Sequence, residues 1–314
     1  MRCFILGIIV MLLIGCGSSI NHKSNECAYS VIDDFGNVVE FASKPQRVYA
    51  TTLSIEELLV DLLPAERIAA ISVDAVDKNY SLIVDKASRV SKKVPPRMNV
   101  ESIVALHPDL VVVQANMNKA YVDALKDVGL KVFITKVPTT IDMVQDRIIK
   151  IADAVGEKEK GQEIIVDMNK KLAYVDSTAG SLPDDRKKVA VAYSMLGAFG
   201  SKDGLYNAIC ERSGLKNGAA MAGLVRGEHL SKERIVDINP DIFIFPSYSS
   251  TQKGDVNRMR QEVLKDPSLQ TTKAIQSQRY IVINDRYRYS ASQYVADAVL
   301  DISRKAYPEL YDKR

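Results

Sequence analysis

One phrase of the sequence occurs twice, and this repeat constrains the fold more than any other feature. Residues 99–113 read NVESIVALHPDLVVV, and residues 231–245, 132 positions later, read SKERIVDINPDIFIF. Each copy holds a residue that can cap a helix, a helical stretch, a Pro-Asp turn and an apolar run typical of a buried strand. A glutamate follows the cap by two residues in both copies, as Glu101 and Glu233. The repeat predicts two related lobes.

The chain around the repeat alternates between two local patterns. Short β-branched runs alternate with helical stretches from residue 47 to residue 135, and again beyond residue 186. This alternation predicts parallel sheets flanked by helices. Before it, residues 29–41 alternate apolar and polar side chains around Asp34-Phe35-Gly36-Asn37, which predicts a hairpin. A chain of 314 residues is long enough for two hydrophobic cores.

Residues 140–182 have a helical pattern without a strand, interrupted at Gly156 and ended before Pro183. A helix over residues 157–178 would be about 33 Å long, enough to cross a small domain. We predict an α/β protein of two lobes, each a mainly parallel sheet with flanking helices, joined by a single long α-helix. The N-terminal lobe is expected over residues 28–156, the linking helix over residues 157–182 and the C-terminal lobe over residues 183–314.

The N-terminus has the features of an export signal. Its first fifteen residues, MRCFILGIIVMLLIG, carry one charge and a short apolar run, too short to cross a bilayer as a helix. The stretch LIGCGSS resembles a bacterial lipoprotein signal, which implies that residues 1–15 are removed and that Cys16 is acylated; the alternative is a secretory signal cut elsewhere. Residues 16–27 are predicted to be a flexible tether. The resemblance implies a protein anchored on the extracytoplasmic face, at the cell surface or in the periplasm.

Composition excludes several functions. Forty-two basic residues against 39 acidic ones give a net charge of +3, which argues against a nucleic-acid partner. The histidines are His22, His107 and His229, without the cluster of histidines and carboxylates that a bare zinc or manganese ion needs. Outside the signal and the lipidation site, the cysteines are Cys27 and Cys210, and the sequence leaves open whether they pair.

An exported α/β enzyme is a distant alternative. Residues 197–204, GAFGSKDG, follow a predicted strand and could cradle a phosphate, but they lack both the GxGxxG and the GK[ST] patterns. Ser194 and Ser201 have no histidine partner that the sequence assigns. We therefore interpret residues 197–204 as a cleft loop and expect no catalysis.

Together, these features resemble one family. The sequence is similar to the substrate-binding lipoproteins of ABC importers for iron-siderophore complexes, cobalamin and haem, the helix-linked class of periplasmic binding proteins. The resemblance extends from DDFGNVVEFASKPQRVYA at residues 33–50, through both repeats, to KAIQSQRYIVIN at residues 273–284. It implies a monomer without an intrinsic cofactor, which captures a metal chelate between its lobes and delivers it to a permease served by a separate ATPase subunit.

The resemblance also gives the paired glutamates a role. In that family a glutamate at the outer tip of each lobe docks onto an arginine pocket of the permease, and by motif position these are Glu101 and Glu233. Bonds between glutamate and arginine specify orientation and association rate more than affinity. The alternative, compatible role is a favourable interaction with the helix dipole, typically about 0.3 to 1 kcal/mol.

The ligand is expected beyond the carboxyl ends of the strands, where two lobes would face each other across a cleft. The candidate loops are residues 51–54, 97–98, 115–118, 193–201, 246–251 and 284–290. The last reads NDRYRYS, in which guanidinium groups suit carboxylate or catecholate charge and phenol rings suit flat apolar surface. The alternative is a solvated loop. The candidate ligand-binding residues are Arg286, Arg288, Tyr287, Tyr289, Tyr193, Tyr248, Arg97, Met98 and Tyr80.

The identity of the chelate stays open at this point. A ferric siderophore fits the arginines and tyrosines, with haem and cobalamin as alternatives. Haem would need an axial ligand, for which Tyr248, Met98 and His229 are candidates. The chain has no tryptophan, on which cobalamin binders of the family often rely, and this weakens the cobalamin hypothesis.

Overall fold

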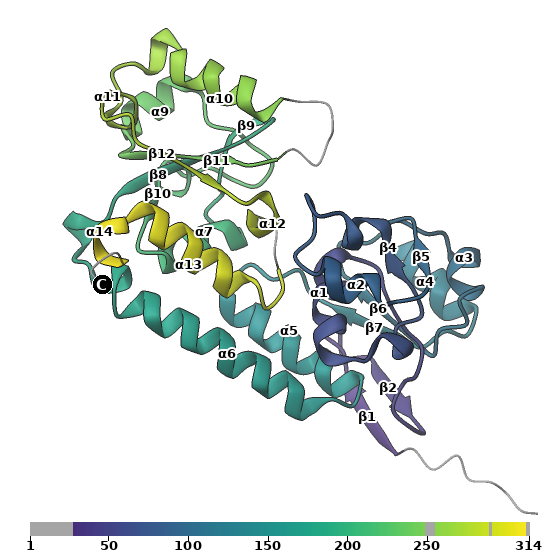
Figure 1. Cartoon of the computed structure of the whole chain (residues 1–314). Helices are drawn as coiled ribbons and strands as arrows, with labels where there is room; N and C mark the ends of the chain where they lie inside the picture. The colour runs from purple at the N-terminus through teal and green to yellow at the C-terminus, as the bar shows by residue number, and fades with distance from the viewer. Residues whose placement is uncertain (1–27, 249–254, 289–290, 312–314) are drawn as a thin grey trace, which may run out of the picture.

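The computed structural model describes residues 28–248, 255–288 and 291–311, and these form two lobes side by side (Figure 1). We call the lobe built on strands β3, β6 and β7 the N-lobe and the lobe built on β8, β10, β11 and β12 the C-lobe. The predicted α/β class and the two mainly parallel sheets are confirmed. Cys16, Cys27, His22 and Tyr289, all named above, lie outside the described residues, and for Arg288 only the backbone is described.

The N-lobe sheet has the order β3-β6-β7 with all pairs parallel, and a separate parallel pair, β4-β5, lies beside it. The predicted hairpin, β1-β2, is confirmed as an antiparallel pair. The elements of this lobe are β1 (Tyr29–Ile32), β2 (Val38–Phe41), β3 (Val48–Ala50), α1 (Leu53–Leu62), η1 (Ala65–Arg67), β4 (Ile71–Ser72), η2 (Val73–Val76), α2 (Val84–Ser88), β5 (Lys93–Val94), α3 (Val100–Val104), β6 (Leu110–Gln114), α4 (Lys119–Asp127) and β7 (Val132–Thr135).

The C-lobe sheet has the order β10-β8-β11-β12, again parallel, and β9 pairs with β8 in the antiparallel sense. Its elements are η3 (Ala179–Ser181), η4 (Asp184–Arg186), β8 (Val189–Ser194), β9 (Gly197–Phe199), α7 (Leu205–Arg212), β10 (Lys216–Asn217), α8 (Gly218–Met221), α9 (Lys232–Ile238), β11 (Ile242–Pro246), α10 (Val256–Lys265), η5 (Pro267–Leu269), α11 (Lys273–Gln276), β12 (Tyr280–Ile283), α12 (Asp285–Arg288), α13 (Val295–Ala306) and α14 (Pro308–Tyr311).

Both copies of the repeated phrase fold as predicted. The side chain of Asn99 accepts a hydrogen bond from the backbone N–H of Ser102 at 2.9 Å and begins α3. The side chain of Ser231 accepts one from Arg234 at 3.3 Å and begins α9. The strands that follow, β6 and β11, are buried almost throughout, because helices cover both faces of a parallel sheet.

The Pro-Asp turn of the repeat carries a second matched feature that the sequence did not show. The carboxylate of Asp109 accepts backbone N–H groups of Gln46 and Arg47, at 2.6 and 2.9 Å, immediately before β3. In the other copy, the carboxylate of Asp241 accepts the N–H of Val189 at the start of β8, at 2.8 Å. Each aspartate therefore fixes the start of the neighbouring strand relative to its own.

The residue before the proline is also special in both copies. His107 has φ of 48° and Asn239 has φ of 47°, in the left-handed region that non-glycine residues seldom adopt. Each helix thereby turns sharply into its strand. Asparagine and histidine are both among the non-glycine residues that adopt this conformation more often than most.

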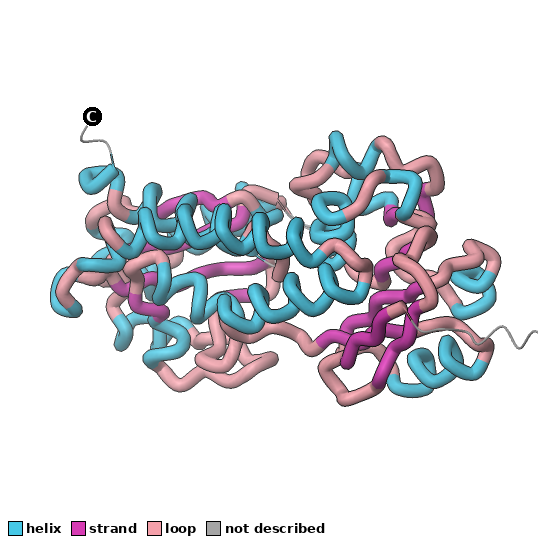
Figure 2. Tube along the Cα trace, turned by 90° about the horizontal axis from the view of Figure 1, so that it is seen from below, coloured by secondary structure: helices cyan, strands magenta, loops and turns pink. Residues whose placement is uncertain are grey.

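A pair of antiparallel helices, α5 (Ile141–Ala154) and α6 (Lys158–Asp176), runs along the lower side of the molecule in Figure 1, a side that Figure 2 shows from below. Gly156 forms the turn between them with φ of 73°. At its first turn, α6 contacts the N-lobe, where the Nζ of Lys160 donates to the carbonyl of Leu62 at 2.9 Å. At its other end, Asp176 pairs with Arg212 of the C-lobe at 2.7 Å. The expected boundaries at residues 156 and 183 stay a prediction.

The helices α5 and α6 form the base of the molecule. One apolar core runs through this base and into both lobes. Leu58 of the N-lobe, Ile148 of α5, Leu172 of α6 and Val299 of the C-lobe all belong to it and are buried. Burying a side chain of this size stabilises a fold by roughly 1.5 to 3 kcal/mol. The base is therefore expected to resist large separation of the lobes.

No helix in the described part of the chain is long and apolar enough to span a membrane.

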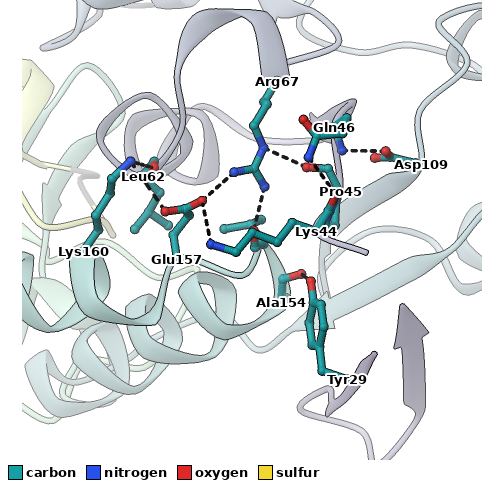
Figure 3. A network of polar contacts seen from close by, with 11 residues as sticks. Tyr29, Lys44, Pro45, Gln46, Leu62, Arg67, Asp109, Ala154, Glu157 and Lys160 are labelled. Atoms are coloured by element: carbon teal, nitrogen blue, oxygen red, sulfur yellow. Dashed lines mark hydrogen bonds and ion pairs between the residues drawn. The ribbon is translucent and has the colours of Figure 1, made fainter. Parts of the chain in front are cut away.

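A polar network fastens the turn between α5 and α6 to the N-lobe (Figure 3). The guanidinium of Arg67 donates to Glu157 at 2.5 Å and to the carbonyls of Val155 and Pro45 at 2.7 and 2.8 Å. Burial opposes ionisation of Glu157, but the bond from Arg67 and the nearby lysines outweigh it and hold the pKa of this carboxyl below its ordinary value. Arg67 thus joins three separate segments of chain.

Replacing Arg67 with methionine is expected to lower the free energy of unfolding by about 2 kcal/mol, because hydrogen bonds to charged groups contribute about 1.5 to 3 kcal/mol. Urea unfolding at pH 7 measures the loss. The matched control is Lys44→Met, since Lys44 contacts the same carboxylate at 3.5 Å but its side chain is 55% exposed. That variant is expected to stay within about 0.5 kcal/mol of the unmodified protein.

The same network predicts a pH dependence. Because the pKa of Glu157 is lowered on folding, its contribution is present above the unfolded-state value of 4.5 and is lost as the pH falls through the folded value. The stability difference between the unmodified protein and Arg67→Met should therefore shrink below about pH 4. A constant difference from pH 7 to pH 3 would contradict the assignment of the network to Glu157.

Candidate ligand site between the lobes

Residues of both lobes line a cavity of about 520 Å³. This volume is within the usual range of roughly 300 to 1,000 Å³ for small-molecule sites. From the N-lobe and the segment leading to α5, its walls include Thr52, Leu53, Ser54, Glu57, Tyr80, Gln114, Asn116, Val137, Pro138 and Thr139. From the C-lobe they include Phe199, Gly200, Ser201, Asp203, Gly204, Leu205, Tyr206, Arg226, Arg286 and Ala291.

The walls are formed where strands end. Thr52 follows β3, Asn116 follows β6 and Val137 follows β7, so the carboxyl ends of the N-lobe sheet face the cavity. In the C-lobe, Gly200 follows β9 and Arg286 follows β12. This is the position in which open α/β sheets bind ligands. A hollow of about 600 Å³ beside β2 is lined by residues of the N-lobe alone and lacks this arrangement.

Two arginines of the C-lobe supply positive charge to the cavity wall. The Nε of Arg286 is buried and has no hydrogen-bond partner among the described residues. Its backbone N–H donates to the side chain of Asn284 at 3.2 Å, which fixes the start of α12. Arg226 is exposed. The Arg286 side chain is half-buried and lines the cavity, so the rest of its guanidinium is suited to an anionic group of a ligand.

A third arginine lies behind the cavity wall. Arg147 of α5 is buried, and its guanidinium donates to the side chains of Gln114 and Ser54, both at 3.2 Å, and to the carbonyl of Ala291. Burial lowers the pKa of Arg147 to about 10, against the opposing charges of Glu57 and Asp34, so it remains a cation at neutral pH. All three hydrogen-bond partners line the cavity.

The structure places two of the predicted ligand residues at the cavity, Arg286 and Tyr80. Tyr287 is half-buried and packs against the large apolar core, where burial raises the pKa of its hydroxyl. The side chains of Arg288 and Tyr289 are not among those described. Arg97 is exposed and does not line the cavity.

Tyr193 was predicted at the cleft, but the structure places it in the C-lobe core. Its ring packs against those of Phe243 and Phe245, with centroids 5.4 and 5.3 Å away. Burial raises the pKa of its hydroxyl above the ordinary value. The reason is that β8 continues to Ser194 and then reverses into β9, so Tyr193 lies inside a strand rather than in a loop.

The three candidate axial ligands for haem are also away from the cavity wall. Met98 packs against the N-lobe core, and its carbonyl accepts the hydroxyl of Tyr121 at 3.0 Å. His229 is exposed beside Gly197, and Tyr248 is half-buried after β11. Within residues 28–248, 255–288 and 291–311, no three His, Cys, Asp or Glu side chains gather as metal ligands would.

Of the two serines considered for catalysis, one is buried and one lines the cavity, and Cys210 is buried. Ser194 is buried, and its hydroxyl donates to the carbonyl of Gly197 at 3.2 Å. Ser201 lies in the cavity wall, as expected for the loop at residues 197–204. Cys210 is buried, and burial raises the pKa of its thiol to about 12.

The two matched glutamates are exposed in the first turns of α3 and α9. Both turns begin on the side of the sheets that faces the cavity. Tyr121 follows the end of β6 that faces the cavity, and its hydroxyl donates to the carbonyl of Met98, just before α3. Leu230, before α9, pairs with Ala198 in β9. Hydrogen bonds from its own backbone N–H and from the Ser231 hydroxyl hold the pKa of Glu233 below the ordinary value.

Sequence reasoning did not find Arg147, Glu57 or Arg226. The loop of Arg226 follows a helix, so the rule that ligands bind after strands does not point to it. Arg147 gives a faint signal, since it interrupts the apolar face of IDMVQDRIIKIADA, the sequence of α5. Glu57 gives none, because acidic residues are common in helices.

Comparison with known proteins shows the family to which this chain belongs. The profile of the family described as periplasmic binding protein matches residues 48–287. An uncharacterised ABC transporter substrate-binding lipoprotein of Bacillus subtilis is 25% identical over 248 residues, covering 74% of this chain and 76% of that protein. Another protein of the same bacterium, named "Probable siderophore-binding lipoprotein", is 22% identical over 286 residues, covering 87% of each chain.

Among solved structures, the apo form of a periplasmic heme-binding protein from Roseiflexus sp. RS-1 has the same fold. It superposes with a TM-score of 0.70 at 20% identity, over 84% of this chain and 98% of that chain. The family profile covers most of the sequence, including both repeats and the strands that border the cavity. This chain belongs to the periplasmic binding protein family.

Proposed function

We propose that this protein is the extracytoplasmic substrate-binding component of an ABC importer, and that it captures a ferric siderophore between its lobes. The observation that carries the proposal is the cavity lined by both lobes, with Arg286 and Arg226 on one wall and Tyr80 on the other. Arginines neutralise the charge of carboxylate or catecholate groups, and a phenol ring covers flat apolar surface. The relative named as a siderophore-binding lipoprotein supports this ligand class.

The cycle needs no chemistry in this chain. The ligand enters the cavity, the complex docks on a permease through Glu101 and Glu233, and a separate ATPase subunit drives release. Acylation of Cys16 would hold the protein on the extracytoplasmic face of the membrane. Both glutamates are exposed on the same side of the two sheets as the cavity, which supports docking with the cavity facing the permease.

A panel of chelates tests the ligand class. The purified protein is expected to bind a catecholate or carboxylate ferric siderophore with Kd below about 1 μM, seen as saturable quenching of tyrosine emission. The iron-free siderophore serves as the control for the charge and shape of the complex. Tyrosine emission is a direct reporter here, since the chain has 14 tyrosines and no tryptophan.

Hemin and cyanocobalamin are the other arms of the panel. A Soret shift with hemin and no response to ferric siderophores would replace the siderophore by haem within the same importer class. Tight binding of cyanocobalamin alone would do the same for cobalamin. If none of these compounds is bound, the proposed class of ligand is wrong.

A further inference from the structure

A short segment of the C-lobe, residues 291–293, is held by side chains of the N-lobe and of α5. The hydroxyl of Ser292 donates to the carboxylate of Glu57 at 2.5 Å. The Nε2 of Gln293 donates to the carboxylate of Asp61 at 2.7 Å and to the backbone carbonyl of Glu57 at 2.8 Å. The guanidinium of Arg147 donates to the carbonyl of Ala291. Three segments distant in sequence therefore meet at one point.

The centre of this contact is buried, whereas the side chain of Asp61 at its edge is 15% exposed. Glu57 is 3% exposed, Arg147 is 2% exposed and Ser292 is 1% exposed. A buried charge that loses its partner without gaining water is strongly disfavoured, and networks of this kind favour one arrangement over a range of them. The junction is therefore expected to be either fully formed or opened to water, with little in between.

The contact also lies at the ligand cavity. Ala291 and Glu57 are both part of the cavity wall, as are Ser54 and Gln114, which Arg147 also bonds. The chain leaves α12, which carries Arg286, only a few residues before Ala291. Residues 291–293 are therefore close in sequence to Arg286, whose Nε has no hydrogen-bond partner among the described residues.

We infer that Glu57 and Arg147 are positioning residues, which hold residues 291–293 against α1 and α5 and so set the separation of the lobes and the place of Arg286. The shared apolar core at the base supports the lobes from below, whereas this junction connects them at the cavity itself. The effect on lobe separation does not need the proposed function. The effect on ligand affinity rests on it.

The separation of the lobes can be measured without any ligand. Nitroxide labels at Lys126→Cys in α4 and Lys265→Cys in α10, both exposed positions, report the distance between the lobes by pulsed electron paramagnetic resonance. Cys3, Cys16 and Cys27 are changed to serine in the full chain, and Cys210 is retained because it is buried. A single narrow distance distribution is expected for this labelled protein.

Two variants at one position separate the junction from a general loss of packing. Glu57→Leu keeps much of the volume but cannot accept the Ser292 hydroxyl, and it is expected to add a second, longer distance population. Glu57→Gln retains an oxygen acceptor and is expected to restore the single narrow distribution. Lys171→Met removes the 2.7 Å ion pair with Asp297 between α6 and α13, away from the cavity wall, and is expected to leave the distribution unchanged.

Ser292→Ala provides the same test if Glu57→Leu does not fold, since it removes only the donor. A narrow, unshifted distribution in the folded Glu57→Leu or Ser292→Ala protein would overturn the inference, whatever the ligand proves to be. With ferric citrate and hemin as probes, whichever is bound should be bound at least about fivefold more weakly by Ser292→Ala than by the unmodified protein, since Ser292 does not line the cavity. Equal affinities would overturn the part that concerns Arg286.

Discussion

Charge reversal of both matched glutamates, Glu101→Lys together with Glu233→Lys, is expected to reduce ligand uptake by cells at least about 100-fold. The estimate follows because loss of one partner from a desolvated charge pair costs about 2 to 5 kcal/mol, and each 1.4 kcal/mol is a factor of ten. In these variants the lysine would also repel the permease arginine that the glutamate is proposed to bind. Ligand affinity of the purified double variant is expected to stay within about twofold of the unmodified protein, since neither glutamate lines the cavity.

The single variants refine the expectation. Glu233 is a carboxylate at neutral pH, as glutamates with an ordinary pKa are, and hydrogen bonds from its own N–H and from Ser231 lower its pKa further. Either single reversal should impair uptake, and the double variant should be worse than each. Both reversals also place a cation in the first turn of a helix, so a small fall in Tm is expected from the dipole alone.

The matched control reverses two exposed carboxylates of α6 instead, as Glu159→Lys with Glu163→Lys. It changes the net charge by the same amount, at the base of the protein, and uptake should persist. Normal uptake by the double variant at Glu101 and Glu233 would show that these residues do not dock. Lost ligand affinity would assign them to the binding site instead.

Much of the fold could be predicted because its signals are local. The caps at Asn99 and Ser231 and the hairpin before residue 41 depend on neighbours within a few residues. The repeat then implied two sheets, since the same cap, turn and strand occurred twice. Even so, the sequence did not predict the left-handed conformation of His107 or the hydrogen bonds that Asp109 accepts from the segment before β3. Both depend on how β6 lies against the neighbouring strand.

The candidate site was predictable only in outline. The rule that ligands bind beyond strand ends led to the loop of Arg286, which lines the cavity, since that rule concerns topology. The contact between Glu57 and Ser292 joins residues separated by 235 positions, and nothing near either residue signals it. Tyr193 was wrongly expected at the cleft because the antiparallel pairing of β8 with β9, which keeps this residue inside a sheet, depends on how the chain reverses after Ser194.

Replacement of Arg286 by alanine is expected to weaken binding of the ligand found in the chelate panel by at least about 30-fold. Its guanidinium is half-buried and lines the cavity, so an anionic ligand group would gain a partly desolvated charge-assisted bond there. Loss of such a partner costs about 2 kcal/mol or more. The weakening should come mainly from faster dissociation, because a buried contact forms after the encounter, and stopped-flow tyrosine fluorescence separates the two rates.

Arg226 is the matched comparison, because it lines the same cavity but is exposed. Exposed charges act mainly on association, so Arg226→Ala should slow binding at low salt by a few-fold, with a difference that shrinks at higher salt and little change in dissociation. Arg286→Lys keeps the charge without the planar donor geometry and should fall between alanine and arginine. If Arg286→Ala and Arg226→Ala have the same rates as each other at every salt concentration, burial does not distinguish the two arginines. The anionic group of the ligand would then lie at the mouth of the cavity rather than against Arg286.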